Sequence, residues 1–104
     1  AYVASKHALL GLTRALATEY AQTGVTFNAI CPGFAETDLL TQSVDNIVTK
    51  TGRSAAEARA TLASNNPQKR FIQPEEVAAT AMWLISDAAS SITGQALSIS
   101  GGET

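Results

Sequence analysis

The 104-residue sequence has little of several features that mark large classes of protein. Its single cysteine, Cys31, can form neither an intrachain disulfide nor a cysteine metal cluster, which fits a reducing compartment. Seven basic and nine acidic side chains give a net charge of −2 and no cationic patch. No apolar run approaches the roughly 20 residues that span a bilayer. We therefore expect a cytoplasmic protein with no metal site and with no nucleic-acid or membrane partner.

Hydrophobic spacing predicts alternating helices and strands. The Ser54 to Glu57 spacing matches a capping box, in which both side chains satisfy free amides at a helix start. Pro74 followed by two glutamates is typical of a helix opening. The stripe from Val77 to Ala88 should face a core that also contains Met82 and Trp83. The predicted helices span residues 2–21, 38–50, 54–64 and 74–88, and the predicted strands span 25–31 and 96–100.

Two strands joined by helices should be parallel, which places the chain in the α/β class. The run 25–31 is rich in β-branched and aromatic residues and predicts a strand buried on both faces, with Cys31 as a small buried side chain. A two-stranded parallel sheet is too small to be stable alone. The sequence also begins and ends directly in structured patterns. We therefore expect a fragment of a larger domain, with an unpaired apolar strand edge and poor solubility.

Tyr2 and Lys6 are one helical turn apart, so their side chains share a face with Cβ atoms about 5–6 Å apart. A free tyrosine titrates at about pH 10, and a nearby ammonium favours its phenolate form. The pair is therefore a candidate for acid and base catalysis. The alternative is a surface helix on which the aromatic ring packs against the aliphatic stem of the lysine.

The turn at residues 32–37 is a second candidate site, because ligands of open parallel sheets bind beyond the carboxyl ends of the strands. Gly33 permits close approach of the backbone to a ligand, and Thr37 offers a hydroxyl. The alternative is an ordinary turn in which the Thr37 side chain caps the next helix.

Residues 2–13 resemble the Tyr-x-Ala-Ser-Lys active-site helix of the short-chain dehydrogenase/reductase family. Three more stretches follow in that family's order: Asn-Ala-Ile-Cys-Pro-Gly at 28–33 with Thr37, Arg-Phe-Ile-Gln-Pro-Glu-Glu-Val-Ala at 70–78, and Ile-Thr-Gly-Gln at 92–95. The resemblance spans essentially the whole chain and is weakest from 39 to 69. Four blocks in the same order are far more specific than any single motif.

The resemblance implies the C-terminal part of a doubly wound Rossmann-type parallel sheet. All of residues 1–104 would belong to one NAD(P)-binding domain, with a substrate lid at about 38–70. The family's Gly-rich loop, the residue that selects NAD or NADP and the catalytic serine have no counterpart in the sequence. We therefore expect these residues alone to be inactive. The family also has an aspartate where Ser100 stands, in a region of subunit contact.

Carried over residue by residue, the resemblance makes Tyr2 the acid/base and has Lys6 hold the nicotinamide ribose and favour the phenolate. Pro32 and Gly33 would shape the loop beneath the nicotinamide ring. Ala35 would offer a backbone contact, and Thr37 would bind the carboxamide. The implied reaction interconverts a secondary alcohol and a ketone by hydride transfer with NAD or NADP.

The matching blocks look closest to 3-hydroxybutyrate dehydrogenases and 3-oxoacyl-thioester or polyketide ketoreductases, which implies a 3-hydroxyacyl or 3-oxoacyl substrate. An apolar wall of Phe34, Leu39, Leu40 and Val44 would face this substrate. Family members are commonly homotetramers or dimers. The alternative function is a non-catalytic oligomerisation or interaction module derived from the same fold.

Overall fold

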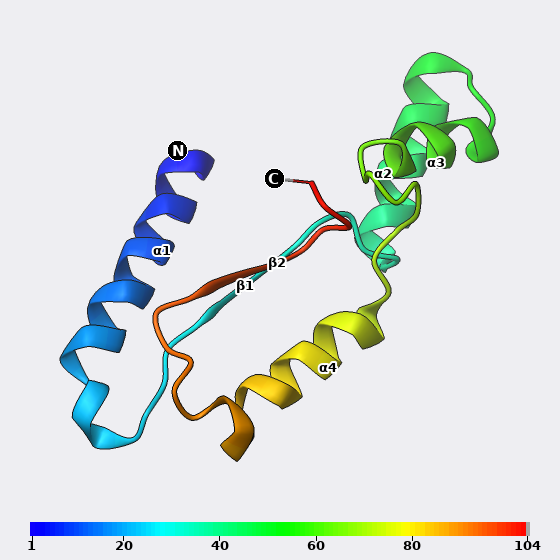
Figure 1. Ribbon diagram of the computed structural model, residues 1–104. Helices are drawn as coiled ribbons and strands as arrows, with labels where there is room; N and C mark the ends of the chain where they lie inside the picture. Colours follow the sequence, from blue (N-terminus) through cyan, green and yellow to red (C-terminus); the bar gives the residue numbers. More distant parts are fainter. Residues whose placement is uncertain (104) are drawn as a thin grey trace. The chain divides into compact units, whose positions relative to one another are not determined.

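The computed structural model describes residues 1–103 (Figure 1). Contacts divide these residues into two compact units. One unit comprises Ala1–Cys31 and Ala78–Leu97, and the other comprises Pro32–Val77 and residues 98–103. The elements follow the predicted order of helix, strand, two small helices, helix and strand. They are α1 (Tyr2–Glu19), η1 (Ala21–Thr23), β1 (Ala29–Pro32), α2 (Asp38–Thr51), α3 (Ala55–Ala63), α4 (Pro74–Leu84), η2 (Asp87–Ala89) and β2 (Ala96–Ile99).

Local signals set the ends of several helices. The Ser54 hydroxyl accepts a hydrogen bond from the Glu57 amide at 3.2 Å, as the capping box predicts. Gly52 ends α2 in the left-handed conformation, with φ +71°. Helix α4 begins at Pro74 as predicted but ends at Leu84, four residues before the predicted end.

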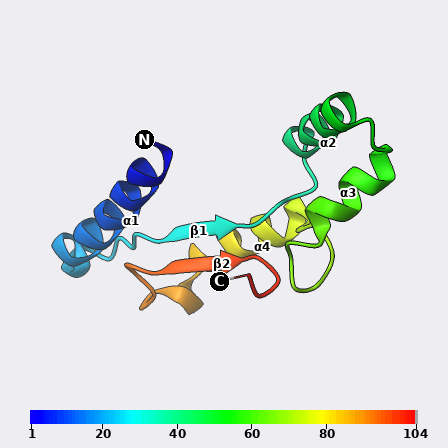
Figure 2. The same ribbon diagram turned by 90° about the horizontal axis from the view of Figure 1, so that it is seen from above.

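Strands β1 and β2 form a two-stranded sheet (Figures 1 and 2). The Ala29 amide donates to the Gln95 carbonyl at 2.8 Å, and the Gly33 amide donates to the Ile99 carbonyl at 2.9 Å. Residue numbers rise together along this ladder, so the strands are parallel, as predicted. The α/β class is confirmed.

The first strand is shorter than predicted, because side chains take part in the pairing at residues 27 and 28, beside one backbone bond from the Gly94 amide to the Phe27 carbonyl. The Phe27 amide donates to the Thr93 hydroxyl at 3.0 Å. The Asn28 side chain donates to the Ile92 carbonyl at 2.9 Å and accepts from the Gln95 amide at 3.1 Å. These bonds attach the chain to the turn before β2 and delay regular pairing until Ala29.

The predicted burial of this strand and of one helix face is wrong. Cys31 is exposed and Ala29 and Ile30 are half-buried. Met82 and Trp83 on α4 are 65% and 44% exposed. Within the described residues the sheet has only two strands, and Cys31, Met82 and Trp83 stay exposed.

The unit that contains α1 has a small core. Ala17 is 5% exposed, and its Cβ lies 3.2 Å from where a Cβ on Gly94 would be. Tyr20 and Phe27 contact each other with ring centres 5.7 Å apart. Leu84 and Ala89 are also buried. This core fixes α1 against the segment that leads into β2.

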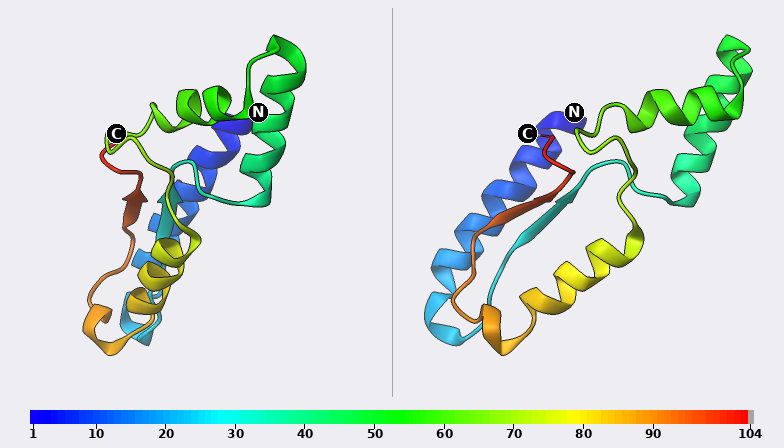
Figure 3. Two further views of the ribbon diagram at one scale, coloured as in Figure 1. Left: turned by 90° about the vertical axis from the view of Figure 1, so that its right-hand side faces the viewer. Right: turned by 45° about the vertical axis from the view of Figure 1, so that its right-hand side comes forward.

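The other unit packs α2 against α3, which lie side by side in Figures 1 and 3. A parallel bridge between Ala35 and Ile72 joins the turn before α2 to the turn before α4. The core of this unit consists of Leu40, Val44, Ala58, Phe71 and Ile72, each at most 7% exposed. Leu40 and Val44 therefore belong to the interior of the predicted lid, and only Phe34 and Leu39 of the predicted apolar wall are exposed.

Candidate active site

Tyr2 and Lys6 lie together at the exposed start of α1. The Lys6 ammonium is 5.5 Å from the centre of the Tyr2 ring. Tyr2 is 73% exposed, so its hydroxyl is accessible to a ligand. The Ser5 amide donates to the Ala1 carbonyl at 2.9 Å, which places the first helical turn between the two side chains. The shared face predicted from the sequence is confirmed, and a cation lies beside a phenol.

The turn after β1 is held at its start by backbone contacts. The Gly33 amide pairs with the Ile99 carbonyl, and a Cβ on Gly33 would lie 3.4 Å from the Ser100 Cα. The Phe34 carbonyl accepts from the Ile72 amide at 2.9 Å. Gly33 therefore allows the backbone to lie close to the chain after β2. The sequence had suggested close approach to a ligand at this residue.

Thr37 is the N-cap residue of α2, but its side chain does not cap the helix. Its carbonyl accepts from the Leu40 and Thr41 amides at 3.0 and 3.2 Å. Within the described residues, its exposed hydroxyl has one acceptor, the Ala35 carbonyl, at the weak distance of 3.5 Å. The side-chain cap considered from the sequence is therefore not formed, and this hydroxyl can bind a ligand.

Tyr2 and Lys6 belong to one compact unit, whereas Gly33, Ala35 and Thr37 belong to the other. That one cofactor contacts both groups remains a prediction from the sequence.

A surface ion pair next to Thr37 was not predicted from the sequence. Arg59 on α3 donates to both carboxylate oxygens of Glu36, at 2.6 and 2.8 Å. Its guanidinium also lies 5.1 Å from the centre of the buried Phe71 ring. The partners are 23 residues apart, so no local spacing rule relates them.

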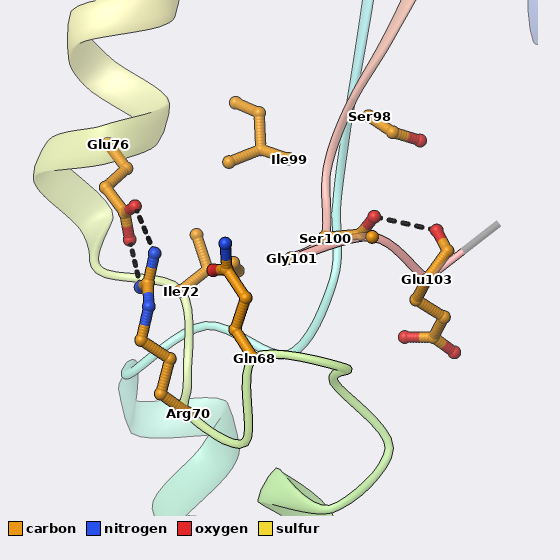
Figure 4. Close-up of a pocket in the computed structure, with 10 residues that line it drawn as sticks. Gln68, Arg70, Ile72, Glu76, Ser98, Ile99, Ser100, Gly101 and Glu103 are labelled. Atoms are coloured by element: carbon orange, nitrogen blue, oxygen red, sulfur yellow. Dashed lines mark hydrogen bonds and ion pairs between the residues drawn. The ribbon is translucent and has the colours of Figure 1, made fainter.

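A cavity of about 380 Å³ lies between residues 68–76 and 98–103 (Figure 4). On one side, Arg70 forms two hydrogen bonds with the Glu76 carboxylate, at 2.8 and 2.9 Å. The Gln73 amide donates to the same carboxylate at 2.7 Å. The Arg70 hydrogen bond, followed by that from Gln73, lowers the pKa of Glu76 to about 2. Glu76 in turn raises the pKa of Arg70.

Among residues 1–103, no group of three or more His, Cys, Asp or Glu side chains is arranged to hold a metal ion. No helix in the same part of the chain is both long and apolar enough to cross a membrane.

A family model described as Enoyl-(Acyl carrier protein) reductase matches residues 1–104. A short chain dehydrogenase family protein from Francisella tularensis subsp. tularensis SCHU S4 superposes with a TM-score of 0.93 and 32% identity, covering 98% of this chain and 42% of that chain. The chain belongs to the short-chain dehydrogenase/reductase family.

Named members of this family are also similar. The D-beta-hydroxybutyrate dehydrogenase of Rhizobium meliloti (strain 1021) is 39% identical over 100% of this chain and 41% of its own length. A variant of the actinorhodin polyketide ketoreductase, solved with NADPH, has a TM-score of 0.88 and 39% identity over 98% of this chain and 39% of its own. A 4-hydroxyisoleucine dehydrogenase complexed with NADH has a TM-score of 0.82 and 34% identity over 99% of this chain and 39% of its own.

The chain spans 37–41% of the length of the first curated relatives it matches.

Proposed function

We propose that residues 1–104 act as the C-terminal part of a single NAD(P)-binding domain, in an oxidoreductase that interconverts a secondary alcohol and a ketone. The observation that carries this proposal is the exposed pair of Tyr2 and Lys6 on one face of α1, with the ammonium 5.5 Å from the ring centre. The lid would comprise α2, α3 and the turn that follows, at about residues 38–70. Alone, these residues would be inactive.

The polar groups of Lys6 and Thr37 fit a nicotinamide cofactor, NAD or NADP. The Lys6 ammonium carries three donors, which suit the hydroxyls of the nicotinamide ribose. The Thr37 hydroxyl, which has only a weak bond to the Ala35 carbonyl in the described residues, suits the carboxamide, which both donates and accepts hydrogen bonds. Pro32 and Gly33 would shape the loop beneath the ring, and Ala35 would add a backbone contact. When bound, the cofactor supplies or accepts the hydride.

Tyr2 would exchange the proton that accompanies the hydride. During reduction its hydroxyl donates a proton to the carbonyl oxygen, and during oxidation its phenolate takes a proton from the alcohol. The Lys6 charge favours the phenolate that forms after donation. The turn at 32–37 would orient the ring, so that one face meets the substrate.

A 3-hydroxyacyl or 3-oxoacyl substrate is the class that we propose. Two similar proteins are named for such chemistry, a D-beta-hydroxybutyrate dehydrogenase and a polyketide ketoreductase. Phe34 and Leu39 are 46% and 73% exposed and offer an apolar surface for an acyl chain. We further propose a cytoplasmic homotetramer or dimer. The exposed Leu9 and Leu12 of α1, each 54% exposed, support such an assembly.

The test uses the complete polypeptide that carries this chain, with acetoacetyl-thioester as substrate and NADH or NADPH absorbance as the signal. We expect Tyr2→Phe to abolish turnover. Binding of NADH and of NADPH to this variant is measured separately by fluorescence. Tyr20→Phe is the matched control, because Tyr20 is the C-cap residue of α1, at the opposite end of the helix from Tyr2, and its ring contacts Phe27. Equal turnover by the Tyr2→Phe variant would refute the assignment of Tyr2.

Failure of the unaltered polypeptide to bind either nucleotide would instead favour the non-catalytic interaction module. Binding of a nucleotide without turnover of acetoacetyl-thioester would retain the oxidoreductase and reject the substrate class. The two nucleotides, tested side by side, also decide between NAD and NADP.

A further inference from the structure

Arg59 holds the residue that precedes Thr37. One terminal nitrogen of its guanidinium reaches both carboxylate oxygens of Glu36, at 2.6 and 2.8 Å. The guanidinium also lies 5.1 Å from the centre of the Phe71 ring, which is only 7% exposed. Because a packed ring restricts the guanidinium, the arginine has fewer positions than a free surface side chain. Arg59 therefore restricts where Glu36 can lie.

The backbone around Glu36 is held as well. The Glu36 amide donates to the Ile72 carbonyl at 2.8 Å, and the Ile72 amide donates to the Phe34 carbonyl at 2.9 Å. Ile72 is 1% exposed, so this bridge rests on the core of its unit. Thr37 directly follows this isolated bridge and begins the first turn of α2, where its carbonyl accepts from the Leu40 and Thr41 amides.

The Thr37 turn is connected to α3 in two ways, through α2 and through Arg59. Thr37 starts α2, and α2 packs on α3 through buried side chains that include Val44 and Ala58. Helix α3 carries Arg59, which returns to Glu36, the neighbour of Thr37. A change in the position of α3 would therefore act on the Thr37 turn through the pair of Arg59 and Glu36 as well as through α2.

We propose that Arg59 is a positioning residue of the cofactor site: its pairing with Glu36 fixes the backbone next to Thr37 and so aims the Thr37 hydroxyl at the nicotinamide carboxamide. This inference rests on the proposed function, which assigns Thr37 to the carboxamide. Both paired side chains are 39% exposed, and exposed ion pairs contribute little to overall stability. The main effect of the pair is then on the local geometry of the turn.

The experiment measures the dissociation constant of NADPH, or of NADH if that is the nucleotide bound, on the complete polypeptide. We expect Arg59→Met, which keeps the aliphatic stem and removes the charge, to weaken binding by roughly three- to tenfold, the combined effect of an exposed ion pair and a cation–π contact. Arg59→Lys should bind almost as tightly as the unaltered protein, because a single nitrogen makes both bonds to Glu36.

A double-mutant cycle with Thr37→Val shows whether Arg59 acts through Thr37. Valine keeps the branched shape and suits the extended backbone of Thr37, with φ −134° and ψ 173°. We expect Arg59→Met to weaken binding little further once the Thr37 hydroxyl is gone. The same weakening in both backgrounds would overturn the proposal. So would an unchanged dissociation constant for Arg59→Met accompanied by a lower melting temperature.

Arg53→Met is the matched control, since the Arg53 side chain bonds the Thr61 hydroxyl at 3.1 Å and forms no ion pair with a carboxylate in the described residues. It should leave nucleotide binding unchanged. If Arg59→Met fails to fold, Glu36→Gln removes the charge of the other partner and takes its place in the cycle. An unaltered polypeptide that binds neither nucleotide would overturn the proposed function and this inference together. An effect of Thr37→Val without one of Arg59→Met would overturn this inference alone.

Discussion

At the scale of single residues, Gly101 shows how closely two chain segments can approach when one lacks a side chain. Its φ is +65°, and a Cβ at this position would overlap the side-chain amide of Asn66. Asn66 is only 7% exposed, and its oxygen accepts from the Gln68 amide at 2.7 Å. The amide therefore has no room to move away without losing this bond.

We expect Gly101→Ala to lower the free energy of unfolding by about 2–4 kcal/mol, because it combines a strained backbone with an overpacked site. Urea unfolding of the complete polypeptide measures this loss. Gly11→Ala is the control, since Gly11 is helical and has nothing within 4 Å of the added Cβ. That change should raise stability by about 0.5–1 kcal/mol. Equal stability of the two variants would contradict the packing described for Gly101.

At the scale of elements, the start of α4 depends on Glu76. Its carboxylate accepts from the Gln73 amide and pairs with Arg70. The pKa of Glu76 is about 2 in the folded chain against an ordinary value of 4.5. Because the folded pKa is the lower one, the pair stabilises the folded chain above about pH 4.5. This contribution is lost as the pH falls from about 4.5 to about 2.

We therefore expect Glu76→Gln to flatten the pH dependence of the urea midpoint between about pH 4.5 and about pH 2. Unfolding curves recorded from neutral pH down to about pH 2 test this. Glu75→Gln, in the same first turn of α4 but without an ion pair among residues 1–103, should leave the dependence unchanged. A curve for Glu76→Gln that overlays the unaltered one would exclude Glu76 as the source of acid sensitivity.

Which elements the sequence predicts correctly depends on how local their signals are. The capping of α3 by Ser54 and the start of α4 at Pro74 depend on residues at most three positions away, and both are confirmed. The start of β1 depends on Thr93, 66 positions from Phe27, and it was predicted four residues too early. The pair of Glu36 and Arg59 joins separate elements in the same way and could not be predicted from spacing.

The candidate site follows the same rule. Tyr2 and Lys6 are neighbours on one helical face, so their contact was predictable from spacing alone. The exposure of Cys31 could not be predicted from spacing, because it depends on whether neighbouring strands cover β1. Whether the Thr37 hydroxyl caps α2 could not be predicted either, since the sequence permits both a capped and an uncapped helix start.

At the scale of the whole molecule, large apolar side chains lie exposed on α1 and α4. Leu9 and Leu12 are 54% exposed, and Ile85, just after α4, is 77% exposed. Exposed apolar surface of this kind favours association in water. The chain spans about two-fifths of its curated relatives, so these faces are where further parts of a complete protein or other subunits would pack.

We expect residues 1–104, expressed alone, to associate at micromolar concentrations and to bind an apolar dye. Ile85→Lys should reduce this association, because a charge replaces a side chain that is already exposed. Leu84→Lys, one residue earlier, is the contrasting variant: Leu84 is 8% exposed, and its replacement should unfold the unit. Sedimentation velocity and circular dichroism separate the two effects. Association that is unaffected by Ile85→Lys would show that the associating apolar surface does not include Ile85.

The uncapped start of α2 has one more consequence, for motion and its control by ligands. A threonine side chain at an N-cap normally stabilises a helix by about 1 kcal/mol, and Thr37 does not supply this bond. The first turn of α2 should therefore open more readily than the turn of α3 that Ser54 caps. A nucleotide that bonds Thr37 would restrain its turn on binding. Amide hydrogen exchange in residues 38–41 would then slow with nucleotide present, which makes the helix start itself a reporter of cofactor occupancy.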